Sequence, residues 1–301
     1  MRPPFQERFQ VYVMGPTQDV RLANVAAGQS VPKINLTIDL EAPFVLRRRA
    51  LGPVFGAVGV GLPFLKTRWT GPTQDYRQGD LMILESLQQP YFGQNGSPSP
   101  VSPEITYPPG GTLSLDLINT GASPLTNVTF YWIGVNLYPW GVLPAPSYPS
   151  EFRGSNFAQP FLTPALTAPD VQLRLPFKCK PDGDFVIRGG QAAQSGTAAG
   201  CPPVITPGVL AATGALSIVL RDYNGMPYMN DWVDINILFG TSLAADFGTG
   251  PGHPGIIYPE IYLPENRQLL IDVQQTVAGT AGANLLINFI GAKIFKGARE
   301  Q

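Results

Sequence analysis

The residue types that most often carry catalysis are scarce in this chain of 301 residues. It contains a single histidine, His253, and two cysteines, Cys179 and Cys201. A single histidine cannot form a His-rich metal centre. Any Ser-His-Asp triad or Cys-His dyad would have to use that residue. His253 lies in a run of glycine and proline with no nucleophile motif beside it, and the cysteines form no CxxC motif. We therefore expect no catalytic residues, no bound metal and no cofactor.

Carboxylates are the remaining candidates for chemistry, because two of them in one cleft can act as general acid and general base. Asp116 and Asp272, and likewise Glu104 and Glu260, have similar sequence contexts in the two halves of the chain. A catalytic pair usually belongs to one cleft, whereas a carboxylate present in both halves suits a shared structural role. We expect these groups to pair with arginines or to close turns, and a glycoside hydrolase is a disfavoured alternative.

The densest basic cluster is formed by Arg47, Arg48 and Arg49. Such a cluster can bind phosphate or an acidic protein surface. No second basic patch accompanies it and the formal net charge is −1, whereas a nucleic-acid binder normally carries a basic excess. We therefore expect no sequence-specific nucleic-acid partner, while contact with an acidic partner protein stays open.

Tryptophan rings offer a further possibility, since a flat ring can lie on the apolar face of a sugar. The four tryptophans are Trp69, Trp132, Trp140 and Trp232. Trp132 lies in a strand-like run and is expected in the core. The others leave open a carbohydrate-binding or receptor-binding module.

The composition favours a β protein that works in an assembly. The chain has 33 glycines and 32 prolines, which disfavours long helices because both residues are costly inside one. Charged residues make up 14% of the chain, against about 25% in an ordinary soluble domain, so copies repel one another weakly. The longest uncharged runs, 50–65 and 189–220, are interrupted by glycine and proline, and we expect no membrane-spanning helix.

Three pairs of similar segments occur in the same order in the two halves of the chain. The pairs are Phe44–Arg47 with Phe185–Arg188, Pro103–Leu117 with Pro259–Val273, and Phe130–Tyr138 with Leu286–Phe295, and the last pair aligns on an Ile-Gly dipeptide. The offset is 141 positions for the first pair and 156 or 157 for the others. We predict two copies of one domain, at 1–140 and 160–301, joined by a stiff Pro- and Gly-rich linker at 141–159.

Within each half the apolar residues alternate with period two, as in β-strands. Leu113, Leu115 and Leu117 alternate with Ser114 and Asp116, while the run around Trp132 is apolar on both faces and should form a central strand. Turn signals such as Pro-Pro-Gly-Gly, Asn-Thr-Gly and Asn-Gly separate the runs. The predicted fold class is all-β, with two tandem antiparallel β-sandwich, jelly-roll-like domains.

Several of these motifs resemble a known group of proteins. The pattern comprises Ala-Pro-Phe-Val-Leu-Arg-Arg at 42–48, the run from Pro103 to Asn119, and the strands at 128–138 and 286–295. It is similar to small β-sandwich virion proteins of tailed bacteriophages, which decorate the capsid or belong to the head–neck region. The resemblance implies a non-enzymatic virion protein, assembled in a host cytoplasm, that binds major capsid or neck proteins and forms homo-oligomers.

Two rival functions accompany this reading, a double-jelly-roll major capsid protein and a carbohydrate- or receptor-binding module. For the bacteriophage virion protein we expect contacts with other copies and with the major capsid or neck proteins through loops and edge strands. The predicted contact residues are Arg47, Arg48 and Arg49, Phe5 and Phe9 in the N-terminal arm, and His253 in its Gly/Pro loop.

Overall fold

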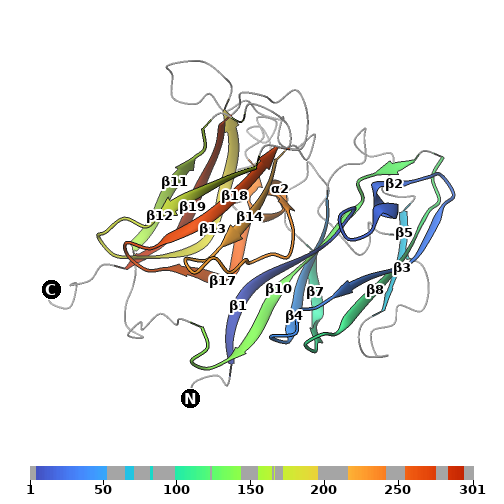
Figure 1. Cartoon of the computed structure of the whole chain (residues 1–301), viewed down its shortest axis with the longest axis horizontal. Coiled ribbons are helices and arrows are strands. Elements are labelled where there is room, and N and C mark those ends of the chain that lie inside the picture. The colour runs from blue at the N-terminus through green and yellow to red at the C-terminus, as the bar shows by residue number, and fades with distance from the viewer. Residues whose placement is uncertain are drawn as a thin grey trace. The chain divides into compact units, whose positions relative to one another are not determined.

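The structure, a computed structural model of the chain, is built almost entirely of β-strands (Figure 1). It describes residues 5–52, 65–70, 82–83, 99–122, 124–143, 155–164, 166, 172–195, 216–241, 255–275 and 284–294. In these ranges the helices are one turn of 3-10 helix, η1 (Val20–Ala23), and one turn of α-helix, α2 (Ile235–Leu238). None of the helices found there is long and apolar enough to cross a membrane.

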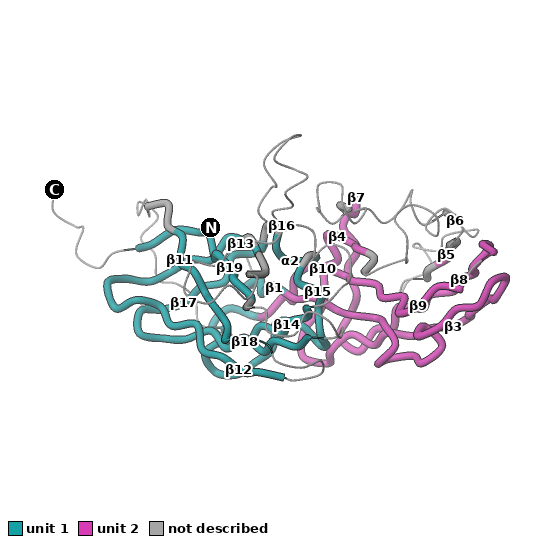
Figure 2. The backbone as a smooth tube through the Cα atoms, turned by 90° about the horizontal axis from the view of Figure 1, so that it is seen from above, with its two compact units in different colours: residues 1–9, 139–301 teal, residues 10–138 magenta. Residues whose placement is uncertain are grey.

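The chain divides into two compact units (Figure 2). Unit 2 comprises Gln10–Tyr138, and unit 1 comprises Met1–Phe9 together with Pro139–Gln301. The boundary between the units falls inside strand β1 (Phe5–Met14). The predicted domain boundaries of 1–140, 141–159 and 160–301 stay a prediction, and residues 144–154 of the predicted linker lie outside the described residues.

Unit 2 contains two four-stranded sheets, with the strand orders β1-β10-β4-β7 and β3-β8-β5-β6, and a short ribbon, β2-β9. The pairings of β4 with β10 and β7, and of β8 with β3 and β5, are antiparallel. The strands other than β1 are β2 (Asn24–Val25), β3 (Ser30–Thr37), β4 (Phe44–Gly52), β5 (Leu65–Thr70), β6 (Met82–Ile83), β7 (Ser99–Tyr107), β8 (Thr112–Asn119), β9 (Leu125–Thr126) and β10 (Thr129–Pro139).

Unit 1 likewise contains two sheets. One has the order β11-β19-β13-β17, with the two-residue strand β16 also paired to β13, and the other has the order β12-β18-β14-β15. The short pairing of β13 with β16 is parallel, and the pairings of β13 with β19 and β17 are antiparallel. The strands are β11 (Ser155–Leu162), β12 (Gln172–Lys178), β13 (Asp184–Ser195), β14 (Leu216–Arg221), β15 (Val233–Asp234), β16 (Gly240–Thr241), β17 (Gly255–Leu263), β18 (Gln268–Gln275) and β19 (Asn284–Ile294).

The two sets of sheets have the same strand order. When the eight main strands of each set are counted along the chain, one sheet has the order 1-8-3-6 and the other 2-7-4-5. This is the topology of a jelly roll, an eight-stranded sandwich of two Greek keys. The predicted fold class of two antiparallel, jelly-roll-like sandwiches in one chain is confirmed.

The similar sequence segments lie on equivalent strands of this topology. The Phe-Val-(Leu/Ile)-Arg motif begins β4 in one set of sheets and lies at the start of β13 in the other. The Pro-Glu-Ile segments lie in β7 and β17, the Asp-containing runs in β8 and β18, and the Ile-Gly dipeptides in β10 and β19. Descent of the two halves from one duplicated domain stays an inference from the sequence.

The core of unit 2 lies between its two sheets. Leu113, Leu115 and Leu117 of β8 are buried while the residues between them are partly exposed, as the alternation predicts. From the other sheet, the Phe44 ring packs edge-on against Tyr12, with 4.8 Å between the ring centroids. Trp132 is 1% exposed on β10, between β1 and β4, which confirms it as a core residue of a central strand.

Phenylalanines form much of the core of unit 1. The Phe177 ring lies 4.6 Å from the Phe289 ring and 6.3 Å from the rings of Phe161 and Phe185, measured between centroids. Phe239, just after α2, packs edge-on against Phe289 at 5.6 Å. These rings come from strands of both sheets, so they hold the two layers of the sandwich together.

Gly134 and Gly291, the glycines of the two Ile-Gly dipeptides, mark the closest approach of the central strands. A Cβ atom at Gly134 would overlap the carbonyl oxygen of Val45 on β4, and one at Gly291 would overlap the carbonyl oxygen of Val186 on β13. The register between β10 and β4 shifts at Gly134. Only glycine therefore fits at these positions, because the obstacle is backbone rather than a movable side chain.

We expect Gly134→Ala and Gly291→Ala each to destabilise the chain by at least about 1–3 kcal/mol, the usual cost of overpacking a core. Urea unfolding followed by fluorescence measures the effect. Gly15→Ala is the matched control, because its Cβ would meet the side-chain oxygen of Thr129 at 3.0 Å, and that side chain can move. Equal midpoints for Gly134→Ala, Gly291→Ala and the control would contradict this account.

Candidate functional site

The glutamates of the repeated Pro-Glu-Ile segments both pair with arginine. Arg47 Nε on β4 donates to Glu104 Oε1 on β7 at 3.0 Å, and Arg188 Nε on β13 donates to Glu260 Oε1 on β17 at 2.6 Å. Both arginines belong to the Phe-Val-(Leu/Ile)-Arg motif. Because Glu104 and Glu260 are well exposed, each pair contributes at most about 1 kcal/mol to stability.

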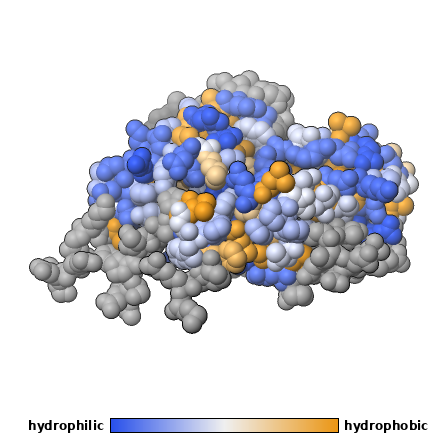
Figure 3. All heavy atoms as spheres, turned by 60° about the horizontal axis from the view of Figure 1, so that its bottom comes forward, coloured by the Kyte–Doolittle hydropathy of each residue, from blue (hydrophilic) through white to orange (hydrophobic). Residues whose placement is uncertain are grey.

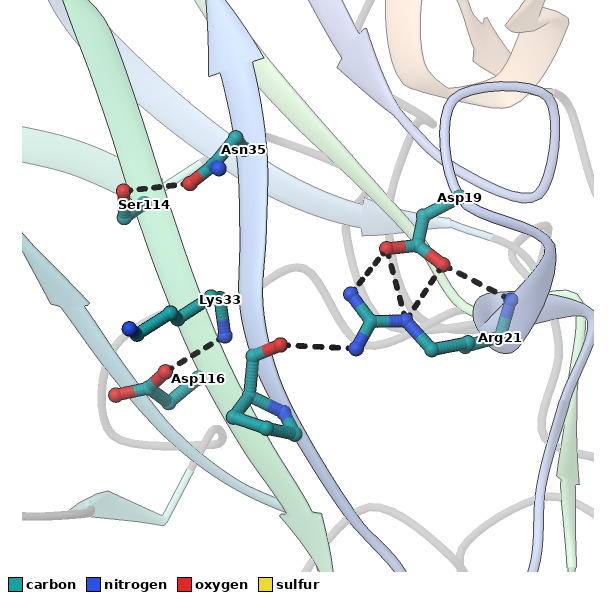
Figure 4. Close-up of polar contacts among 7 residues, drawn as sticks. Asp19, Arg21, Lys33, Asn35, Ser114 and Asp116 are labelled. Carbon is teal, nitrogen blue, oxygen red and sulfur yellow. Dashed lines mark hydrogen bonds and ion pairs between the residues drawn. The ribbon is translucent and has the colours of Figure 1, made fainter.

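The repeated aspartates are held in a similar way on the second sheet of each set. Asp116 on β8 accepts a hydrogen bond from Arg68 Nη2 at 2.7 Å. It also accepts one from the Lys33 backbone N–H at 2.9 Å (Figure 4). Asp272 on β18 is buried and accepts from Arg174 Nε at 2.5 Å and from Arg221 Nε at 2.8 Å. Each aspartate thus joins its strand to the strands beside it.

These contacts keep both aspartates ionised. Burial by itself raises the pKa of Asp272, but the hydrogen bonds and positive charges of Arg174 and Arg221 outweigh it and lower the pKa below its ordinary value. Burial also raises the pKa of Asp116, but the hydrogen bonds from the Lys33 N–H and Arg68 outweigh it, so that the pKa lies below its ordinary value. A general acid needs the opposite shift. The expectation that the repeated carboxylates pair with arginines is confirmed.

Further polar contacts fix the loops that surround β3. Asp19 caps the short helix η1 by accepting from the Arg21 N–H, and its carboxylate also binds the Arg21 guanidinium (Figure 4). Arg21 Nη1 in turn donates to the Pro32 carbonyl on β3, and Ser114 Oγ donates to Asn35 Oδ1 between β8 and β3. All these side chains are used within the fold.

A buried lysine is the least expected group in unit 1. Lys293 on β19 is fully buried, and its Nζ lies 2.7 Å from Asp182 Oδ1 and 3.2 Å from the Lys180 carbonyl oxygen. Cys179 Sγ lies 3.6 Å from the same nitrogen. The hydrogen bond with Lys293 lowers the pKa of Asp182, and burial raises the pKa of the Cys179 thiol. The ammonium thereby ties the turn between β12 and β13 to a central strand.

The structure places the predicted contact residues in different environments. Phe5 is 47% exposed, whereas Phe9 is 2% exposed and lies in the core. Arg47 pairs with Glu104, Arg48 is partly exposed, and Arg49 is buried. His253 lies outside the described residues. Their role in binding a partner stays a prediction.

The N-terminal arm is anchored by two side chains that the sequence analysis did not single out. Gln6 Oε1 accepts from the N–H groups of Gly141 and Leu143, and Gln6 Nε2 donates to the Leu143 carbonyl, all at 3.2 Å. Arg8 donates to the carbonyls of Met226 and Pro227 at 3.0 and 2.8 Å. The sequence gives no signal for them, because Gln6, Glu7 and Arg8 are consecutive polar residues and nothing in that run identifies backbone carbonyls as partners.

Arg8 also forms an ion pair and a cation–π contact. Its guanidinium is 3.5 Å from Asp222 Oδ2 and 4.2 Å from the centroid of the Tyr228 ring. Both Gln6 and Arg8 are buried. The first residues of β1 are therefore firmly attached to two other segments of unit 1, 139–143 and 222–228.

Prolines occupy most of the outer strands of the sheets. They lie inside β3, β7, β11, β12 and β17, at Pro32, Pro100, Pro103, Pro160, Pro176 and Pro259. Of the inner strands, β4, β5, β8, β13, β14, β18 and β19 contain none, and β10 has one only at its end, Pro139. Since proline has no N–H to offer a neighbouring strand, these edges are poorly suited to accept another chain. The outer strands β1, β6 and β15 contain no proline, and the predicted use of edge strands as contacts stays a prediction.

The tryptophans are spread through the fold. Trp132 is in the core, Trp140 is 41% exposed in the turn after β10, and Trp232 is partly exposed. Trp69 lies in β5, and Cys201 lies outside the described residues. Within the described ranges, no group of three or more His, Cys, Asp or Glu side chains could hold a metal ion.

No protein-family model and no curated protein sequence matches the chain. Solved structures with a distant likeness include the atomic structure of Sulfolobus Turreted Icosahedral Virus, at 11% identity over 93% of this chain and 90% of that one, with a TM-score of 0.28. The crystal structure of the STIV MCP has 13% identity over 93% and 96%, with a TM-score of 0.25. That of T=1 Penaeus vannamei nodavirus has 10% identity over 95% and 98%, with a TM-score of 0.24. TM-scores this low do not establish a shared fold, so the jelly-roll assignment depends on the strand order of the chain itself.

We expect Asp272→Asn to reduce the free energy of unfolding at pH 7 by about 1–3 kcal/mol, because hydrogen bonds to a charged group are lost. The lowered pKa of Asp272 also makes this contribution depend on pH. It is complete above the ordinary pKa of 3.8 and is lost as the pH falls toward the folded-state value. Urea midpoints measured from pH 7 down to pH 3 should therefore fall less for Asp272→Asn than for the wild type. An identical fall in both proteins would contradict the assignment.

A second prediction separates the two partners of the buried lysine. Lys293→Met leaves Asp182 half exposed and hydrated, whereas Asp182→Asn leaves a buried ammonium without its counter-charge. Because an uncompensated buried charge is worse than a well-packed apolar side chain, Asp182→Asn should lower the thermal unfolding midpoint more than Lys293→Met. The reverse order would show that the lysine does not depend on Asp182.

Proposed function

We propose that this chain is a structural subunit of a virus shell, a double-jelly-roll major capsid protein. The observation that carries the proposal is the strand order, 1-8-3-6 over 2-7-4-5, present twice in one chain. Jelly rolls are common in viral capsids, although lectins and other proteins share the fold. The fold alone therefore does not decide the function, and the side chains have to be considered.

The contacts of the side chains favour a structural role over a catalytic one. The four repeated carboxylates, which were the best candidates for general acid–base chemistry, are bound to arginines. The space between the sheets of unit 2 is filled by a continuous cluster of apolar side chains that includes Tyr12, Phe44 and Trp132. The sparse charge and the net charge of −1 suit subunits that pack against one another.

The resemblance to virion proteins of tailed bacteriophages also favours a virion role. A decoration or head–neck function, with the major capsid or neck proteins as partners, is the second form of the proposal and stays a prediction. The two forms differ in what the chain does alone. A shell subunit assembles with its own copies, whereas a decoration protein needs a particle to bind.

The test is the assembly state of the purified full-length chain. We expect light scattering and electron microscopy to show closed shells or regular patches of shell once the concentration passes a threshold, as for contacts between like subunits. The chain should also be the most abundant protein of the virions that contain it. Gly134→Ala, which disturbs the sandwich, serves as a control for folding.

Two other results would overturn the shell proposal. Binding to stripped virions at fixed stoichiometry, without assembly of the chain alone, would assign the decoration or neck role. A monomer that ignores particles but binds glycans, with loss of binding in Trp140→Ala or Trp232→Ala, would assign a carbohydrate-binding module.

A further inference from the structure

Two buried side chains of unit 1, Cys179 and Lys293, have chemistry that the fold does not need. The repeated carboxylates are bound to arginines, and on the face shown in Figure 3 hydrophobic residues reach the surface at scattered points. The thiol of Cys179 is free of any disulfide, and it lies in contact with the amine of Lys293. Both groups are nucleophiles. We call these two residues the Cys-Lys pair.

The Cys-Lys pair is held at close range inside the sandwich. Lys293 Nζ lies 3.6 Å from Cys179 Sγ, and the two residues are 0% and 3% exposed. Lys293 lies in β19, and Cys179 directly follows β12 in the other sheet, where its backbone N–H is bound by the Arg267 carbonyl. Because the backbone on both sides is fixed, the two reactive atoms stay together, which corresponds to a high effective concentration.

Asp182 supplies the base that the Cys-Lys pair needs. An amine is nucleophilic only after its ammonium form has lost a proton. The carboxylate of Asp182 lies 2.7 Å from Lys293 Nζ, and its side chain is half exposed. Asp182 is therefore placed to accept that proton and to pass it on to solvent.

Burial selects the oxidant that can reach the pair. A thiol with almost no exposed surface is closed to glutathione and to the thiols of other proteins, whereas dioxygen is small and apolar enough to enter a protein core. Burial also raises the pKa of the Cys179 thiol. Little thiolate is then present at pH 7, so we expect any oxidation at this site to be slow.

We propose that dioxygen joins Cys179 Sγ to Lys293 Nζ through one oxygen atom, which makes the Cys-Lys pair the site of an oxidative N–O–S cross-link. The S–H bond and one N–H bond of the neutral amine break, an S–O and an O–N bond form, and the second oxygen atom leaves as water. Sulfur and nitrogen each lose two electrons, and dioxygen gains four. An inserted oxygen atom suits the 3.6 Å separation, because a direct S–N bond would require the two atoms to move closer together.

The cross-link closes a covalent loop between positions 114 residues apart. It limits the freedom of the unfolded chain as a disulfide does, and it fastens the turn between β12 and β13 to a central strand. Such a bond is expected outside a cell rather than in a reducing cytoplasm. The inference goes beyond the proposed function and does not rest on it.

The test is mass spectrometry of the full-length chain, purified with a reductant and then kept for several days in air-saturated buffer. The product should be heavier by about 14 Da, because one oxygen atom is gained and two hydrogen atoms are lost. After digestion, the peptide that contains Cys179 should be linked to the peptide that contains Lys293. Dithiothreitol should remove the added mass and separate the peptides.

Three variants distinguish the cross-link from other oxidation products. Cys179→Ser and Lys293→Met should not give the linked product, whereas Cys201→Ser is the matched control and should give it as the wild type does. A loss of about 2 Da that is absent in Cys201→Ser identifies a disulfide between the two cysteines, and a gain of about 16 Da without linked peptides identifies simple addition of oxygen. Either of these results overturns the proposal, and so does an unchanged mass.

Thermal unfolding gives an independent measurement. The oxidised chain should unfold at a temperature at least about 5 °C higher than the reduced chain, because the closed loop lowers the entropy of the unfolded state. Dithiothreitol should abolish the difference, and Cys179→Ser should show none. The assembly of the chain is measured separately, so the absence of the cross-link would leave the shell function standing.

Discussion

The close approach of two central strands is the constraint on which each jelly roll depends. In each set of sheets the eighth strand lies between the first and the third, and a glycine lets the backbone of the third strand come within contact distance. Two positions before each glycine, Trp132 of β10 and Phe289 of β19 are buried in the core. The ion pairs between neighbouring strands then help to align a sandwich whose stability comes mainly from that core.

Equivalent ion pairs occur in the two halves of the chain, but the residues around them differ. The Arg-Glu pairs join equivalent strands and are exposed in both halves. Asp116 binds one arginine and a backbone N–H, whereas Asp272 binds two arginines and is buried. The position of Lys293 corresponds, by the Ile-Gly alignment, to Asn136 in the first half. A buried amide there needs no counter-charge, while a lysine requires Asp182 on the neighbouring turn.

Much of the fold could be predicted from the sequence because its signals are local or repeated. Alternation identified the strands, glycine and proline identified the turns, and the ordered matches identified two sandwiches of similar type. The pairing of the repeated carboxylates with arginines could be predicted from their recurrence. No sequence motif identifies Arg68, Arg174 and Arg221 as the partners. The anchors Gln6 and Arg8 could not be predicted, because they bind backbone atoms more than 130 positions away.

The prolines of the outer strands set how this chain can behave when many copies are crowded. A strand interrupted by proline is a poor template for a cross-β fibre, so β3, β7, β11, β12 and β17 are less open to that irreversible state. Copies that meet through side chains can also part without exchanging strands.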